Sequence, residues 1–189
     1  MALNVAQYEE IASLLRQVPR LVDRLEARRS SFAEDVLEWL RQVETTLENN
    51  RIPAVSQIAS CRATLIGAAR GVRAKEVVFV GRATPRKMHD ATASMVLERG
   101  NELLHAVIAE RQAVFQEAER ITRQIMTIAE AKGFIRACNG GRPHQAFITC
   151  LQQSIAEDRD LVNAYSHLVA LVGKTDVLIF IDRALPKVA

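Results

Sequence analysis

The side chains that could hold a metal ion gather around one glycine-rich segment. Cys138, His144 and Cys150 flank the sequence Asn-Gly-Gly at 139–141, and thiolates and imidazoles are ligands that zinc prefers. Their spacing lacks the short Cys-x2–4-Cys pair by which zinc sites are recognised. Because Cys61 and Cys150 lie in apolar stretches, we expect buried structural thiols there in place of a metal centre.

A second metal pattern lies farther upstream, on a predicted helix. Glu102 and His105 are one helical turn apart, as in the Glu-x-x-His pairs of di-iron helical bundles. Such a site needs a second pair and two further carboxylates, yet no other histidine has a glutamate three residues before it. The sequence therefore predicts no metal and no cofactor.

The segment RGNELLH places Arg99 and His105 on the same predicted helix. This Arg-x5-His spacing resembles the motif of the HEPN family of helical ribonucleases, in which Arg and His from two protomers converge on an RNA phosphate. The resemblance covers these two residues, and Gly100 stands where the family has a polar residue. It implies a metal-independent ribonuclease that uses Arg99 and His105, whereas the alternative is an ordinary solvated helix face. Phosphate-binding glycine loops, a Ser-His-Asp order and paired catalytic carboxylates are not evident.

Basic charge is concentrated in the middle of the chain. Residues 51–87 carry eight basic side chains and one acidic one, a net charge of +7 in a chain whose total is +3. Such a region attracts a polyanion, and Phe79 is its one aromatic residue, so we expect contact with a nucleic-acid backbone or an acidic protein without base stacking. The predicted contact residues are Arg62, Arg70, Arg73, Lys75, Arg82, Arg86 and Lys87.

A second basic series recurs every four residues near the N-terminus: Arg16, Arg20, Arg24 and Arg28. On one uninterrupted helix these arginines would form a ridge. Asp23 and Glu26 are interleaved with them, and Pro19 interrupts the segment, so we interpret the series as a solvated helix face.

Composition favours a single helical domain with an aliphatic core. The 189 residues are 49% hydrophobic and 25% charged, with five prolines and eight glycines. Three cysteines argue against a disulfide-stapled secreted protein and favour a reducing compartment. The N-terminus lacks the pattern of a signal peptide, and the apolar runs are too short to span a bilayer. We therefore expect a soluble, cytoplasmic protein.

Apolar residues recur at helical spacing through most of the chain. They predict long helices over 19–49, 53–70, 84–137 and 143–173, after a shorter one over 5–17. Ser31-x-x-Glu34 offers an internal break in the first of them, and Gly100 a bend in the third.

Two short β-branched runs depart from this helical period. EVVFVGRATP at 76–85 and DVLIFIDRALP at 176–186 share a pattern that is either an internal duplication, with units 18–84 and 85–189, or a coincidence. A duplication predicts that the two runs pair as a minimal β ribbon, with Val78, Phe79, Leu178 and Phe180 buried together.

The predicted fold is therefore all-α: an elongated bundle of two long helical hairpins, with at most a minimal two-stranded β element. Long helices with continuous apolar stripes predict self-association or an obligate partner, as in a coiled coil. The predicted function is that of a non-enzymatic scaffold or accessory subunit with a basic contact region at 51–87, and the alternative is the HEPN-like ribonuclease.

Overall fold

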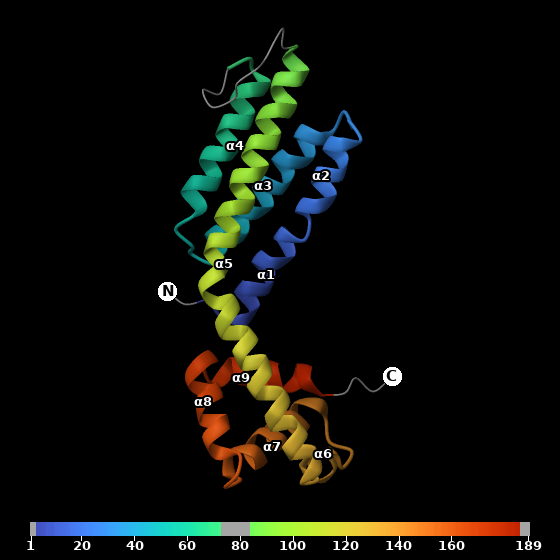
Figure 1. Ribbon diagram of the computed structural model, residues 1–189, viewed down its shortest axis with the longest axis vertical. Coiled ribbons are helices and arrows are strands. Elements are labelled where there is room, and N and C mark those ends of the chain that lie inside the picture. Colours follow the sequence, from blue (N-terminus) through green and yellow to red (C-terminus); the bar gives the residue numbers. More distant parts are fainter. Residues whose placement is uncertain (1–2, 73–83, 186–189) are drawn as a thin grey trace. The chain divides into compact units, whose positions relative to one another are not determined.

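The computed structural model of the protein describes residues 3–72 and 84–185 (Figure 1). All regular secondary structure in these two ranges is helical, which confirms the all-α class. The helices are α1 (Val5–Leu15), α2 (Val18–Glu26), α3 (Phe32–Asn49), α4 (Val55–Ala69), α5 (Pro85–Ala131), α6 (Phe134–Asn139), α7 (His144–Glu157), α8 (Val162–Val172) and α9 (Lys174–Ala184).

The chain divides into two compact units, and the boundary between them lies within α5. We call Ala6–Ala109 the N-terminal unit, and Met1–Val5 together with Glu110–Ala189 the C-terminal unit. The boundary therefore does not coincide with the end of the first expected repeat at residue 84. The expectation of a single domain stays a prediction.

The core of the N-terminal unit is built around α3, which packs on α4. Its fully buried residues follow the helical period: Val36, Leu40, Val43 and Leu47. Trp39, on the same helix, is 2% exposed, and its indole Nε1 donates a hydrogen bond to the Leu14 carbonyl at 3.1 Å. This bond ties α1 to α3 inside the core.

Gly100 gives Trp39 the space it occupies. A Cβ atom at Gly100 would lie 2.8 Å from Cζ3 and 3.0 Å from Cη2 of the indole ring. Carbon atoms do not approach this closely without displacement, so α5 requires glycine at this point.

Replacing Gly100 with alanine is expected to destabilise the N-terminal unit by up to about 2 kcal/mol in chemical denaturation. Overpacking a core costs about 1–3 kcal/mol, and the gain of about 1 kcal/mol that alanine brings to a helix offsets part of that cost. Gly67→Ala in α4 is the matched control, because the nearest atom to its added Cβ would be Val72 Cβ at 3.6 Å. The control should stabilise the protein by about 0.5–1 kcal/mol. Equal effects of the two substitutions would contradict the close contact.

The predicted helix over 19–49 is two helices, α2 and α3, separated by a sharp turn. Arg28 adopts a left-handed conformation with φ of +51°, and the Arg29 N–H bonds to the Arg24 carbonyl at 3.0 Å. The Ser31 hydroxyl donates to the Asp35 carboxylate instead of capping α3. The internal break offered by Ser31-x-x-Glu34 is confirmed, since α3 begins at Phe32, whereas the side-chain cap is absent.

The predicted helix over 143–173 is also interrupted, at Asp158, between α7 and α8. Gly173, with φ of +85°, then separates α8 from α9, and Gly71, with φ of +84°, closes α4 as the sequence predicted. The predicted start at Thr84-Pro85 is confirmed, since α5 begins at Pro85 and the Thr84 hydroxyl accepts the Lys87 N–H at 3.3 Å.

The second β-branched run is helical, so the expectation of a strand there is wrong. It lies in α9, where Val177, Phe180 and Ile181 are buried at spacings of three and one, and Leu178 is half-buried. This spacing matches one face of a helix. The first run, with Val78 and Phe79, lies outside the described residues, so its pairing with α9 is untested.

Residues Leu3–Val5 belong to the C-terminal unit. The Val5 N–H donates to the buried Asp176 carboxylate at 3.0 Å, and Arg111 Nε donates to the Leu3 carbonyl at 2.9 Å.

Among the helices described, none is by itself long and apolar enough to cross a membrane. The pair α8 and α9 meets that test only when taken together across a bend of 115°.

Candidate functional site

A groove in the N-terminal unit lies between the α2–α3 turn and the first turns of α5. It has a volume of about 620 Å³ and is lined by Leu25, Arg28, Arg29, Phe32, Thr84, Arg86, Lys87 and Asp90. Four of these side chains are cationic and one is anionic. We call this feature the basic groove.

The turn between α2 and α3 brings two arginines to the groove. The left-handed conformation of Arg28 turns the chain away from the axis of α2. Arg28 and Arg29 are exposed there, and both line the groove. Arg24, one turn earlier, forms an ion pair with Asp35 at 2.6 Å. The charge of Arg24 is therefore balanced within the unit.

The beginning of α5 supplies the other two cations. Arg86 Nη2 donates to the Arg28 carbonyl at 3.4 Å, which joins the two sides of the groove, and its Nε lies 3.8 Å from Asp90. The partial positive charge of the α5 N-terminus adds to the field of Arg86 and Lys87. Within the two described ranges, the structure shows no ion pair for Arg28, Arg29 or Lys87.

The predicted contact residues fall into three groups. Arg86 and Lys87 line the basic groove, and Arg70 is exposed at the end of α4. Arg62 instead holds α4 to α3, because its guanidinium bonds both carboxylate oxygens of Glu44, at 2.5 and 3.3 Å. The remaining predicted contacts lie outside the described residues: Arg73, Lys75 and Arg82.

Sequence reasoning did not select Arg28 and Arg29 as contact residues. Arg28 belongs to the four-residue arginine series, but α2 begins at Val18 and ends at Glu26, so neither Arg16 nor Arg28 lies on it. The turn after α2, and not a helical ridge, directs Arg28 to the groove.

Arg99 and His105 both lie on α5 and are exposed. Six residues along an α-helix correspond to about 600°, so the two side chains leave the helix about 120° apart. Convergence on one phosphate would need a second protomer, and the ribonuclease interpretation stays untested.

The expectation of buried thiols at Cys61 and Cys150 is confirmed for Cys61 and is wrong for Cys150. Cys61 is buried in α4, whereas Cys138 and Cys150 form a disulfide between α6 and α7. The disulfide also uses the two thiols that a zinc site at 138–150 would need. In the part of the chain that the structure describes, no group of three or more His, Cys, Asp or Glu residues could hold a metal ion.

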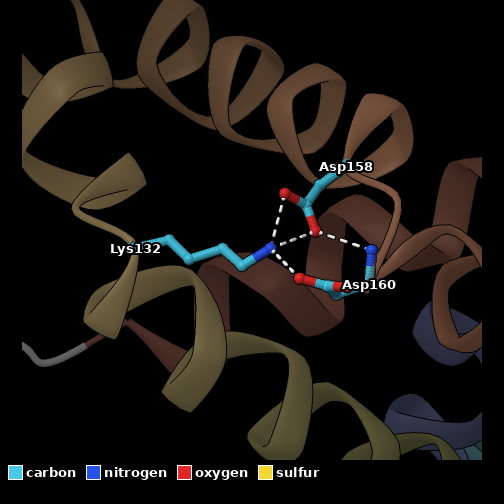
Figure 2. Close-up of polar contacts among 3 residues, drawn as sticks. All are labelled: Lys132, Asp158 and Asp160. Carbon is cyan, nitrogen blue, oxygen red and sulfur yellow. Dashed lines mark hydrogen bonds and ion pairs between the residues drawn. The ribbon is translucent and has the colours of Figure 1, made fainter.

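A compact ionic cluster joins the end of α5 to the turn between α7 and α8 (Figure 2). Lys132 Nζ lies 2.6 and 2.7 Å from the Asp158 carboxylate oxygens and 2.5 Å from Asp160 Oδ2. The hydrogen bond from Lys132 holds the pKa of Asp158 below its ordinary value, and the bonds to Asp158 and Asp160 raise the pKa of Lys132. The ammonium group occupies the space between the two carboxylates, so this cluster is structural.

Stability should depend on this cluster at acid pH. Since the pKa of Asp158 is lowered by folding, its contribution is present above the unfolded value of about 3.8 and is lost as the pH falls through the lower folded value. Asp158→Asn should therefore reduce the free energy of unfolding at neutral pH and flatten its decline on acidification. Asp23→Asn, at an exposed position of α2, is the control. Parallel pH–stability curves for Asp158→Asn and wild type would rule out this contribution.

Comparison with protein-family models, curated proteins and solved structures gave no match to this chain.

Proposed function

We propose that the protein is a non-enzymatic helical scaffold or accessory subunit that contacts a polyanion through the basic groove. The polyanion is a nucleic-acid backbone or an acidic partner protein. The observation that supports this function is the convergence of Arg28 and Arg29 with Arg86 and Lys87, from two segments far apart in the sequence, around one groove.

Electrostatics favour an anionic ligand at this place. Asp90 is the one acidic residue of the lining and stands against four cations, so the groove keeps a net positive charge. Clustered cations on a concave surface attract anions and increase their rate of association. Arg86 and Lys87 come from the basic region 51–87, and Arg28 and Arg29 extend that region across the groove.

The lining favours recognition of charge over recognition of bases. Phe32 is the aromatic residue of the groove, and it is 1% exposed, so its ring is not free to stack on a base. Stacking on aromatic rings is what usually holds single-stranded bases. Binding should therefore depend on salt far more than on nucleotide sequence.

Fluorescence anisotropy at several salt concentrations tests the proposal. The probes are a single-stranded RNA, a duplex DNA and polyglutamate. The slope of log K against log salt is negative, and replacing Arg28, Arg29, Arg86 and Lys87 with glutamine should bring it closer to zero by about 0.7–0.9 for each phosphate that the variant no longer neutralises. Preference for polyglutamate would identify an acidic protein as the partner, and absence of salt-dependent binding to all three probes would refute the function.

A matched control carries the same change of charge outside the groove. Its substitutions to glutamine are at exposed arginines of the N-terminal unit: Arg16, Arg20, Arg41 and Arg99. It should keep most of the binding if the groove is the contact site. An equal reduction of affinity in the two variants would show that net charge alone matters.

The same RNA serves to test the ribonuclease alternative. That alternative predicts cleavage in the presence of a metal chelator, and loss of cleavage in an Arg99→Ala, His105→Ala variant. Intact RNA together with salt-dependent binding would favour the scaffold function.

Self-association is part of the proposal and has its own measurement. Among the described residues, four large apolar side chains are partly exposed, from 37% to 63%: Val22, Val72, Ile128 and Val162. We expect a dimer or larger assembly by light scattering at micromolar concentration. A compact monomer there would remove self-association from the proposed function and leave the basic groove unaffected.

A further inference from the structure

The disulfide of the C-terminal unit joins a very short helix to a longer neighbour. Cys138 lies near the end of the six-residue α6, and Cys150 lies in the middle of α7, with their Cα atoms 5.7 Å apart. The bond spans 12 residues and encloses the loop between the two helices.

Helix α6 is short and has few features of its own that would keep it folded. An isolated helix of six residues is unstable in water, because the cost of its nucleation is not recovered over so few hydrogen bonds. No side chain caps its N-terminus, and glycines in the left-handed region lie on both sides of it: Gly133 with φ of +78° and Gly141 with φ of +74°. Such glycines can absorb large changes of backbone angle, so α6 lies between two potential hinges.

The surroundings of the two sulfur atoms suit both the oxidised and the reduced state. The Ser154 hydroxyl lies 3.6 Å from Cys138 Sγ and can accept a hydrogen bond from a thiol there. Cys138 is 2% exposed, whereas Cys150 is half-buried, so a small thiol from solution reaches Cys150 first. A disulfide across a short loop also stabilises the folded chain less than one across a long loop.

We propose that Cys138 and Cys150 form a reversible redox clasp that holds α6 against α7 when oxidised and releases it when reduced. Release opens the segment between Gly133 and Gly141, while α7 and the rest of the C-terminal unit stay folded. The clasp is independent of the basic groove, whose residues belong to the N-terminal unit.

The exchange is chemically balanced with glutathione as the reductant. A glutathione thiolate attacks Cys150 Sγ, and the Cys138 thiolate leaves and takes up a proton. A second glutathione thiolate attacks the glutathione sulfur of the mixed disulfide, and Cys150 leaves and is protonated. The protein gains two electrons and two protons, and two glutathione molecules become one molecule of glutathione disulfide. Reoxidation by glutathione disulfide reverses both steps.

Limited trypsin digestion of the full-length protein tests the clasp. Arg136 is exposed on α6, whereas Arg142 precedes Pro143 and is a poor trypsin site. We expect cleavage after Arg136, followed by mass spectrometry, to be about ten-fold or more faster in the reduced protein than in the oxidised one. Hydrogen exchange should accelerate over 134–139 and remain unchanged in α8.

Two variants make the comparison specific. Cys138→Ala, Cys150→Ala should be cleaved at the fast rate in both oxidising and reducing buffer, and circular dichroism would check that it is folded. Cys61→Ser, in the N-terminal unit, should keep the full difference between the two buffers. If the double variant fails to fold, the oxidised and reduced wild-type proteins still provide the comparison.

Either of two results would overturn the proposal. The disulfide could persist in native protein through all glutathione mixtures, from fully oxidised to fully reduced, which would identify it as a permanent cross-link. Alternatively, the reduced and oxidised proteins could be cleaved after Arg136 at equal rates, which would show that packing alone holds α6.

Discussion

Replacing Trp39 with alanine is expected to lower the free energy of unfolding of the N-terminal unit by about 3–5 kcal/mol. The indole is 2% exposed, fills the space beside Gly100, and donates to the Leu14 carbonyl at 3.1 Å. Alanine would leave a cavity in the core and a carbonyl without its donor. Urea denaturation followed by circular dichroism measures the change.

Trp39→Phe measures how much the hydrogen bond and the outer part of the indole ring contribute to stability, apart from the rest of the core packing. Phenylalanine lacks the indole N–H and the ring atoms Cζ3 and Cη2 that approach Gly100, so we expect a smaller loss of stability than for alanine. It should also make Gly100→Ala less harmful, and the double variant should deviate from additivity by more than about 0.5 kcal/mol. Additive effects would mean that the indole and Gly100 do not constrain each other.

The helices could be predicted from the sequence because apolar periodicity and terminal signals agree over long stretches. Pro85 after Thr84 begins α5, and Gly71 ends α4, as local chemistry requires. The break before α3 could be predicted from Ser31-x-x-Glu34, whereas the break at 158–161 is hard to predict because a tight turn keeps the apolar stripe almost in phase. Periodicity reports which face is buried, and it does not report whether the backbone is continuous.

The apolar run in α9 is ambiguous in the sequence for a related reason. A stretch of four or five apolar residues fits a buried strand and a buried helix equally well. The packing of neighbouring helices decides between the two. In the C-terminal unit it buries Val177 and Phe180 and leaves Leu178 half-buried. The disulfide could not be predicted either, because an odd cysteine number does not show which two thiols the fold brings together.

Half of the cationic lining of the basic groove could be predicted from the sequence. Arg86 and Lys87 belong to the obvious basic region, but Arg28 and Arg29 join them through contacts between segments far apart in the chain. Charge counting also selected Arg62, which Glu44 neutralises at 2.5 Å. Charge density along a sequence therefore locates a region, and only the pattern of ion pairs shows which of its charges are available to a ligand.

The proposed contact site and the proposed clasp belong to different units, so their tests do not interfere. Glutamine substitutions in the basic groove leave both cysteines intact, and the cysteine variants leave all four groove cations in place. If polyanion binding changed with the redox state, the two units would be energetically coupled. Measuring the binding of oxidised and reduced protein to the same RNA would detect that coupling.

In the C-terminal unit, Phe180→Ala is expected to cost about 3–5 kcal/mol of stability. Phe180 is 3% exposed, and its ring centroid lies 6.0 Å from that of Phe115 in α5, at an angle of 50°. Aromatic pairs at such distances contribute about 0.5–1.5 kcal/mol beyond the area they bury. Val162→Ala, at a partly exposed position of α8, is the control and should change stability by no more than about 0.5 kcal/mol.

A double-mutant cycle distinguishes ring contact from simple burial. If Phe115 and Phe180 interact directly, the destabilisation of the double alanine variant should differ from the sum of the single effects by more than about 0.5 kcal/mol. Phe115 also lies under the Arg111 guanidinium, 5.6 Å from its ring centroid, and Arg111 holds the Leu3 carbonyl. Removing the Phe115 ring should therefore also loosen the N-terminal residues, visible as faster hydrogen exchange at Val5. Additive effects with unchanged exchange at Val5 would show that α9 is held by general apolar burial and not by this aromatic pair.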